Sequence, residues 1–180
     1  MNIANKFTLL RVILIPVFMV LLYIDAPYLN YVALAVFIVA SLTDYLDGHL
    51  ARSRNLVTNF GKFMDPLADK LLVTAAMLIF VEKGLMPAWA LMIVIAREFA
   101  VSGLRMVAAS DGTVIAAAMS GKIKTAATMV CLCVMMTPVG TFALGPVTLN
   151  MVCVGVIVLT TVISGVEYFV KNGHVLTQEL

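Results

Sequence analysis

Four aspartates at helical spacing are the residues of this chain best suited to chemistry. They form two pairs, each spaced by about one turn, so that both members of a pair lie on one side of a helix. Oxygen-only ligands favour hard cations such as Mg²⁺ or Mn²⁺ over zinc, and two divalent ions would neutralise four carboxylates. Two ions held in this way stabilise the attacking and leaving oxygens of a phosphoryl displacement. The four residues are Asp44, Asp47, Asp65 and Asp69.

Small residues and one arginine accompany the aspartates. Their lack of bulk lets backbone and ligand approach closely, and Arg52 is placed to reach a phosphate through a charge-assisted hydrogen bond. An alternative is that the aspartates pair with Arg52, Lys62 and Lys70 to hold helices together, but pairing does not explain the interleaved glycines. The first stripe consists of Asp44, Asp47, Gly48 and Ala51, and the second consists of Gly61, Asp65 and Asp69.

The composition indicates a membrane protein. Of the 180 residues, 62% are hydrophobic and 12% are charged, whereas ordinary globular domains are about 45–50% apolar and about 25% charged. Ionisable groups at membrane depth are costly and mark function by default. The formal net charge of +2 gives no reason to expect nucleic acid as a partner. The cysteines, Cys131, Cys133 and Cys153, lie in apolar runs and are interpreted as free buried thiols.

The elements that would position the aspartates are six apolar segments, each long enough to approach the thickness of a bilayer. Glycines and prolines separate them, and no internal repeat is present, so we expect one all-α membrane domain over residues 1–180. A short interfacial helix over residues 2–10 could precede it. The motif of residues 44–69 would then lie on the second and third helices. The segments are roughly 11–25, 31–54, 61–81, 86–108, 115–138 and 146–170.

The basic residues predict the orientation of these helices. Nine lie at one set of helix ends, and Lys83 alone lies at the other. The positive-inside rule therefore puts both termini and the acidic motif at the cytoplasmic face. A site at this depth suits a reaction between a lipid and a water-soluble partner. The nine residues are Lys6, Arg11, Arg52, Arg54, Lys62, Arg105, Lys122, Lys124 and Lys171.

The acidic pattern resembles a family signature. Asp44-x-x-Asp47-Gly48-x-x-Ala51-Arg52, eight residues, then Gly61-x-x-x-Asp65-x-x-x-Asp69 matches the CDP-alcohol phosphatidyltransferase family at every fixed position. The resemblance implies a six-helix membrane enzyme, usually a homodimer, that holds two divalent cations, Mg²⁺ or Mn²⁺. In such enzymes an alcohol attacks the β-phosphorus of a CDP-linked lipid and releases CMP.

The same resemblance implies roles for individual residues. Asp69 would be the general base that deprotonates the alcohol, and it could also touch a metal. Arg52 would lie on the diphosphate. The metal ligands would be Asp44, Asp47 and Asp65, and the nucleotide cleft would be lined by Gly48, Ala51 and Gly61.

A basic set in the second half of the chain is a candidate phosphate site. Arg97 lies deep in its segment and needs an anion, but Glu98 points about 100° away around a helix and is an imperfect partner. One hypothesis is a pocket for an anionic acceptor. The alternative is that the lysines anchor the protein at the cytoplasmic surface while Arg97 pairs within the bundle. The pocket would consist of Arg97, Arg105, Lys122 and Lys124.

This basic set also carries a resemblance. Arg97-Glu98…Ser102…Arg105 followed by Gly121-Lys122-x-Lys124-Thr125 is similar to one branch of the family, the phosphatidylglycerophosphate synthases. That similarity implies transfer from CDP-diacylglycerol to sn-glycerol 3-phosphate in a bacterial plasma membrane. Inositol phosphate is the competing acceptor, because it is also phosphorylated.

Two further interpretations stay open. Asn5-x-x-Thr8-x-x-Arg11 resembles the start of these synthases, so that Thr8 could touch the nucleotide, but capping and anchoring roles fit equally. His49 receives no role.

A different function class is an ion or proton transporter with an aspartate relay, although the chain lacks the internal repeat of many transporters. A purely structural subunit leaves the acidic cluster unexplained.

Overall fold

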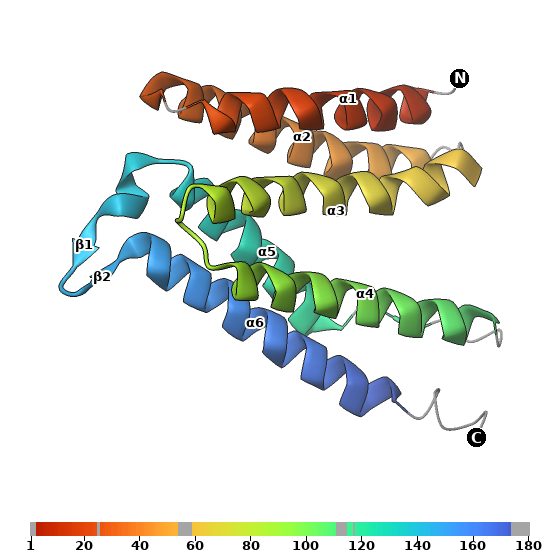
Figure 1. Cartoon of the computed structure of the whole chain (residues 1–180). Coiled ribbons are helices and arrows are strands. Elements are labelled where there is room, and N and C mark those ends of the chain that lie inside the picture. Colours follow the sequence, from red (N-terminus) through yellow and green to blue (C-terminus); the bar gives the residue numbers. More distant parts are fainter. Residues whose placement is uncertain (1–2, 25, 54–58, 111–114, 117, 174–180) are drawn as a thin grey trace. The chain divides into compact units, whose positions relative to one another are not determined.

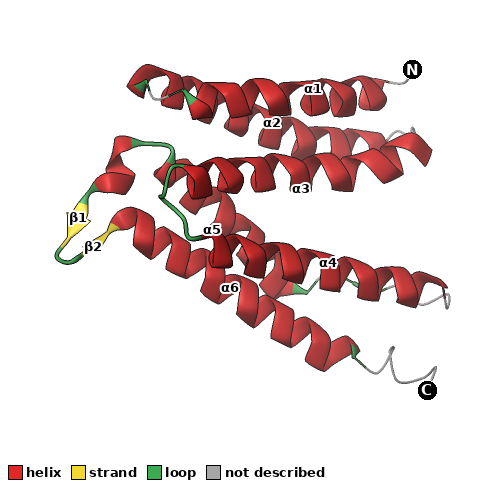
Figure 2. Ribbon diagram, in the orientation of Figure 1, coloured by secondary structure: helices red, strands yellow, loops and turns green. Residues whose placement is uncertain are grey.

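The computed structural model consists of two compact, helical units (Figures 1 and 2). The first unit contains Met1–Glu82 with Met136–Pro138, and the second contains Lys83–Met135 with Val139–Leu180. The structure describes residues 3–24, 26–53, 59–110, 115–116 and 118–173, except for the side chains of residues 3–9, 11, 27, 44–53, 59–69 and 144. That residues 1–180 form a single domain stays a prediction.

The first unit consists of three helices, α1 (Ile3–Tyr23), α2 (Pro27–Ser53) and α3 (Asn59–Glu82). α1 packs against both α2 and α3. Phe18 of α1 and Phe37 of α2 are fully buried, with their ring centroids 5.8 Å apart, a separation at which tilted aromatic rings attract one another. α1 continues through Pro16, so the described residues form one helix where the sequence suggested an interfacial helix followed by a spanning one.

The second unit also has three long helices, α4 (Ala88–Ser110), α5 (Met119–Met135) and α6 (Leu149–Asn172). α6 packs against both α4 and α5. Tyr168 of α6 is buried in an apolar cluster with Val101, Leu104 and Ala108 of α4. α6 is therefore the helix that holds this unit together, and its polar residues are in reach of both neighbours.

A short connection between α5 and α6 contains the only strands in the described residues (Figure 2). A 3₁₀ turn, η1 (Pro138–Thr141), leads into β1 (Ala143–Leu144) and β2 (Val147–Thr148), which pair antiparallel. Gly145 begins the two-residue loop with a φ of 67°, a conformation that glycine adopts without steric cost. Thr148 then caps α6 by accepting a hydrogen bond from the Met151 amide at 3.4 Å.

The six predicted helices are all present within the described residues, with shifted ends. α5 ends at Met135, shortly before Pro138, because the residue before a proline is disfavoured in a helix. α6 begins at Leu149, three residues later than the expected 146, because Val147 and Thr148 form β2 and Thr148 caps the helix. The all-α assignment is confirmed, and the strands are two residues long.

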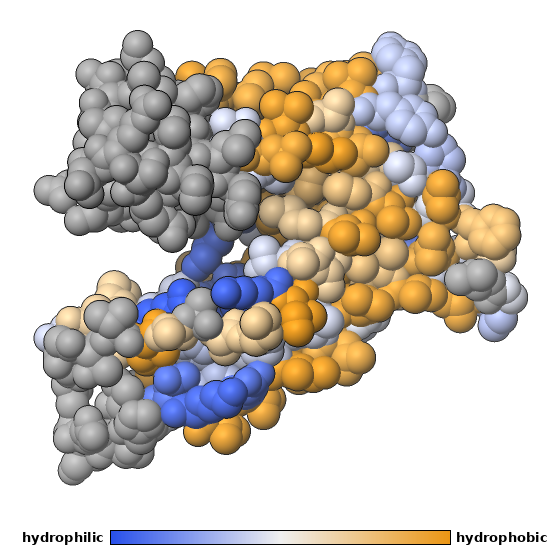
Figure 3. Space-filling model, turned by 180° about the vertical axis from the view of Figure 1, so that it is seen from behind, coloured by the Kyte–Doolittle hydropathy of each residue, from blue (hydrophilic) through white to orange (hydrophobic). Residues whose placement is uncertain are grey.

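Among the described residues, α6 is the one helix long and apolar enough to cross a membrane. Shorter apolar stretches cover Val12–Tyr23 and Tyr28–Thr43. α4 has sufficient length, but it carries three charged residues, Arg97, Glu98 and Arg105. Figure 3 shows apolar side chains over much of the visible face, and large ones such as Phe99 and Val170 are exposed. The number of crossings stays a prediction.

The three cysteines are free thiols, as predicted, but the burial predicted for all three is found for two of them. Cys131 and Cys153 are buried, and Cys133 is partly exposed. They pack in the second unit on α5 and α6 as small apolar side chains.

Candidate active site

The acidic motif lies on two consecutive helices of the first unit. Asp44 and Asp47 belong to α2, and Asp65 and Asp69 belong to α3. Both stretches are helical, so the spacing that predicted one-sided stripes is present in the backbone. The side chains of residues 44–69 are outside the described part of the structure, so their convergence and their metal ions stay predictions.

The backbone places the two aspartate pairs at similar heights. Asp47 is six residues before the end of α2 at Ser53, and Asp65 is six residues after the start of α3 at Asn59. At 1.5 Å per residue, each lies about 9 Å along its helix from the end that adjoins residues 54–58. The two helices run in opposite directions (Figure 1). This arrangement is compatible with a shared acidic site, which stays a prediction.

The other predicted residues of the nucleotide site lie on the three helices of the first unit, α1, α2 and α3. Gly48, Ala51 and Arg52 belong to α2, and Gly61 belongs to α3. Their side-chain contacts, like those of Asn5, Thr8 and Arg11 on α1 and of His49 on α2, are outside the described part. Their roles stay predictions.

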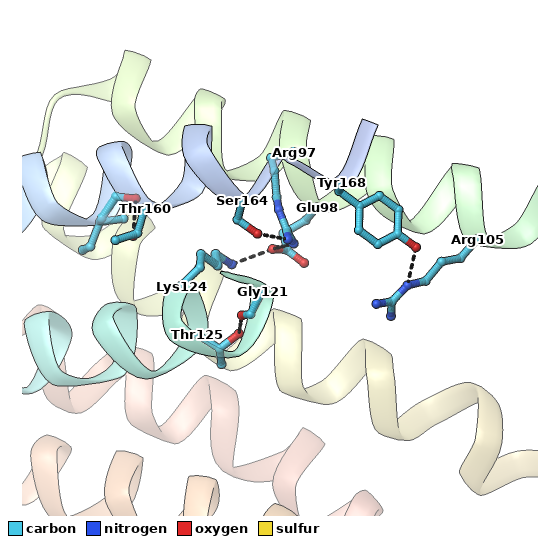
Figure 4. A network of polar contacts seen from close by, with 10 residues as sticks. Arg97, Glu98, Arg105, Gly121, Lys124, Thr125, Thr160, Ser164 and Tyr168 are labelled. Carbon is cyan, nitrogen blue, oxygen red and sulfur yellow. Dashed lines mark hydrogen bonds and ion pairs between the residues drawn. The ribbon is translucent and has the colours of Figure 1, made fainter. Parts of the chain in front are cut away.

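The second unit contains a described cluster of charged side chains (Figure 4). The Nη1 of Arg97 donates to Oε1 of Glu98 at 3.0 Å. The Nζ of Lys124, on α5, donates to the same oxygen at 2.5 Å. The Nη2 of Arg97 donates to Oγ of Ser164, on α6, at 2.6 Å. One carboxylate oxygen therefore joins cations from two helices, and a third helix holds the arginine.

Burial makes this cluster unusual. The side chains of Lys124 and Arg97 are 8% and 13% exposed, whereas that of Glu98 is 24% exposed. Lysine and arginine are almost never buried without a partner, and breaking a buried pair leaves an uncompensated charge. The two cations and one carboxylate leave a formal charge of +1 on these three groups.

The sequence-based view of Glu98 as an imperfect partner of Arg97 is wrong. The two residues form a salt bridge at 3.0 Å. Their Cα–Cβ bonds point about 100° apart around the helix, but both side chains are long enough to bend toward each other. The pairing of Arg97 within its own unit, which the sequence left as an alternative, is therefore present. It does not exhaust the donors of the guanidinium, since Arg97 Nε is buried without a partner among the described residues.

Two glycines leave the space that Arg97 occupies. A Cβ on Gly165 of α6 would lie 3.2 Å from Arg97 Cγ, and a Cβ on Gly121 of α5 would lie 3.6 Å from Arg97 Nη2. The first separation is tighter than ordinary van der Waals contact. Gly121 was predicted from the sequence, whereas Ser164 and Gly165 were not. Their signal was a pair of small residues within the apolar α6, the composition that permits close helix contact in membranes.

Arg105 is held farther along the same seam between α4 and α6. Its Nε donates to the hydroxyl of Tyr168 at 2.9 Å, and its Cζ lies 5.4 Å from the centroid of the Tyr168 ring. Arg97 and Arg105 are eight residues apart on α4, and their partners Ser164 and Tyr168 are four apart on α6. Tyr168 was not predicted from the sequence either, and its position one turn after Ser164 was the available signal.

The four predicted cations are thus not all gathered together. Arg97 and Lys124 share Glu98, and Arg105 follows along α4. Lys122 is exposed on α5, two residues before the buried Lys124 and therefore on another side of the helix. Among the described side chains, the cluster has one more cation than anions and a buried Arg97 donor without a partner, a combination that suits an anion.

Comparisons with known proteins identify the family. The model of the CDP-alcohol phosphatidyltransferase family matches residues 1–166. A Bacillus subtilis protein named CDP-diacylglycerol–glycerol-3-phosphate 3-phosphatidyltransferase is 45% identical, over 97% of each chain. An Escherichia coli protein of the same name is 43% identical over 73% of this chain and 74% of its own. A Mycobacterium tuberculosis protein named probable phosphatidylglycerophosphate synthase is 36% identical over 94% and 81% respectively. The chain belongs to the CDP-alcohol phosphatidyltransferase family.

Proposed function

We propose that this enzyme transfers the phosphatidyl group of CDP-diacylglycerol to sn-glycerol 3-phosphate, giving phosphatidylglycerophosphate and CMP. The similarity that spans 97% of the chain, to a relative whose name states this reaction, carries the proposal. The acidic motif on α2 and α3 and the cation cluster of the second unit supply chemistry for the two substrates. Inositol phosphate is the alternative acceptor.

The acidic motif would hold the donor's diphosphate through two divalent cations, Mg²⁺ or Mn²⁺. The donor set fits these ions, since four carboxylates offer hard oxygen ligands at matched heights on two helices. When bound, the ions supply charge stabilisation for the displacement at phosphorus. Asp44, Asp47 and Asp65 would be ligands, and Arg52 would bind the diphosphate with Gly48, Ala51, Gly61 and Thr8 nearby.

Asp69 would accept the proton of the attacking hydroxyl. A carboxylate within hydrogen-bond reach of that hydroxyl increases its nucleophilicity as the bond to phosphorus forms. The phosphoric anhydride bond then breaks, and CMP leaves with the electron pair.

The cation cluster would bind the acceptor's phosphate. Arg97 and Lys124 are buried with excess positive charge, and Arg105 is oriented by Tyr168 along the same seam. A phosphate accepts charge-assisted hydrogen bonds from guanidinium and ammonium groups alike. Lys122, which is exposed, would contribute through longer-range attraction.

The enzyme would work as a multi-pass protein of a bacterial plasma membrane, with six crossings and both termini in the cytoplasm. The apolar α6, the exposed apolar side chains and the distribution of lysines and arginines support this placement. A homodimer, as the family resemblance implies, is the proposed assembly.

Release of CMP by the purified protein tests the reaction. The assay would contain CDP-diacylglycerol and Mg²⁺ or Mn²⁺, with glycerol 3-phosphate, inositol phosphate, serine or no acceptor. We expect release with glycerol 3-phosphate alone and its loss on addition of a chelator. Release with inositol phosphate would assign another acceptor, and no release by folded protein would contradict the proposed function.

A further inference from the structure

Glu98 pairs with both of the buried cations that the proposed acceptor site would use. Its Oε1 receives hydrogen bonds from Arg97 at 3.0 Å and from Lys124 at 2.5 Å. Arginine and lysine from separate helices are the partners that would bind a phosphate oxygen. A carboxylate oxygen thus already lies between the two cations that the proposed acceptor site needs.

The carboxylate of Glu98 is more exposed than the two cations that it pairs with. Glu98 is 24% exposed, whereas Arg97 and Lys124 are 13% and 8% exposed. Arg97 is also fixed from α6 by Ser164 Oγ, at 2.6 Å. The carboxylate is therefore the more accessible member of the cluster, and the cations are held by the surrounding helices.

The charges of these three described groups do not balance one another. Arg97 and Lys124 together carry +2, and Glu98 carries −1. A second monoanion would neutralise the excess, but a phosphate dianion brings −2 and matches both cations without Glu98. Glu98 and a dianion therefore repel each other at a buried pair of cations, which weakens binding of the dianion.

We infer that Glu98 is the counter-anion of the acceptor site. It is a positioning residue that pairs with Arg97 and Lys124 in the free enzyme and is displaced from them by the acceptor's phosphate. This inference rests on the proposed function. The carboxylate keeps two buried cations paired in the free enzyme. It also sets the affinity for the acceptor, because each binding event must displace it.

Kinetics of Glu98→Gln against glycerol 3-phosphate provide the test, with inorganic phosphate as a competitive inhibitor. Glutamine retains the shape and an acceptor oxygen but removes the competing charge. We expect the KM for glycerol 3-phosphate and the inhibition constant of phosphate both to fall about five- to tenfold, because the repulsion between like charges is lost. The KM for CDP-diacylglycerol should stay within about twofold.

Two further variants complete the design. Glu98→Asp restores the charge and should restore the wild-type constants to within about threefold, whereas a role in packing alone would not follow charge. Glu167→Gln is the matched control, because it removes a carboxylate of the same unit that pairs with the exposed Lys171. It should change neither constant. Size-exclusion chromatography and binding of CDP-diacylglycerol would establish that each variant is folded.

The outcomes separate this inference from the proposed function. If wild-type protein releases CMP with glycerol 3-phosphate but Glu98→Gln leaves both constants unchanged or raises them, Glu98 is not a counter-anion and the proposed function stands. If wild-type protein releases no CMP with glycerol 3-phosphate, the proposed function fails. Calorimetry with inorganic phosphate would then decide the inference, since tighter binding by Glu98→Gln would support it and equal or weaker binding would overturn it.

Discussion

Arg105 is oriented by Tyr168 through two contacts at once. The guanidinium Nε donates to the tyrosine hydroxyl at 2.9 Å, and Cζ lies 5.4 Å from the ring centroid. Tyr168 is itself buried in the apolar contact of α6 with α4, so its ring is fixed. Arg105 has an exposed side chain, and the tyrosine therefore restricts a group that would otherwise sample many rotamers.

Tyr168→Phe should weaken binding of the acceptor without affecting the chemical step. The ring and its cation–π contact remain, but the hydrogen bond is lost. Because such a bond contributes about 1 kcal/mol, we expect the KM for glycerol 3-phosphate to rise about fivefold with kcat nearly unchanged. Tyr28→Phe is the control, since Tyr28 is exposed on α2. A fall in kcat with an unchanged KM would contradict the proposed role of Arg105.

Gly165→Ala should displace Arg97. The new Cβ would lie 3.2 Å from Arg97 Cγ, so the arginine stem must shift by a few tenths of an ångström. We expect the KM for glycerol 3-phosphate to rise about three- to tenfold, because close alignment of a charged donor is lost. Gly155→Ala provides the control on the same helix, where a Cβ would meet nothing within 4 Å. Equal effects of the two substitutions would show that helix propensity, not Arg97, is responsible.

The two lysines of α5 should differ in importance. Lys124 is buried against Glu98, and Lys122 is exposed. Lys124→Gln should raise the KM for glycerol 3-phosphate about tenfold or more, since a hydrogen bond to a charged group contributes about 1.5–3 kcal/mol. Lys122→Gln should have a smaller effect that disappears at high salt. Steady-state kinetics at two salt concentrations would measure both, and a larger effect of Lys122→Gln would reverse the assignment.

Asp69→Asn should separate catalysis from donor binding. The amide retains the size of the side chain but cannot accept the proton of the hydroxyl, so turnover should fall by about 10²–10⁴-fold. Binding of CDP-diacylglycerol, followed by calorimetry in detergent, should remain largely intact. Near-normal turnover of the variant would show that Asp69 is not the base.

The acidic helices could be predicted from sequence because they depend on local periodicity. Charged residues at one-turn spacing within apolar segments predict helix faces directly, and α2 and α3 have the expected backbone. The partners of the basic residues could not be predicted in the same way. Ser164 contacts Arg97 across 67 positions of sequence, and Tyr168 contacts Arg105 across 63. Such contacts depend on how α6 packs on α4, which no local pattern encodes.

Glu98 shows a different limit of sequence reasoning. The angular spacing of neighbouring residues on a helix is correct, but it describes Cα–Cβ directions and not the ends of long side chains.

The hairpin between η1 and α6 was not predicted for a different reason. Its strands are two residues long, too short to show the alternation from which strands are recognised.

The fate of the acceptor's oxygen tests the central claim most directly. Glycerol 3-phosphate labelled with ¹⁸O in its free primary hydroxyl would be incubated with CDP-diacylglycerol, and the lipid product and CMP would be analysed by mass spectrometry. Attack of this hydroxyl on the β-phosphorus predicts that the label is retained in phosphatidylglycerophosphate and absent from CMP. Label in CMP, or no labelled lipid from folded protein, would contradict the proposed phosphatidyl transfer.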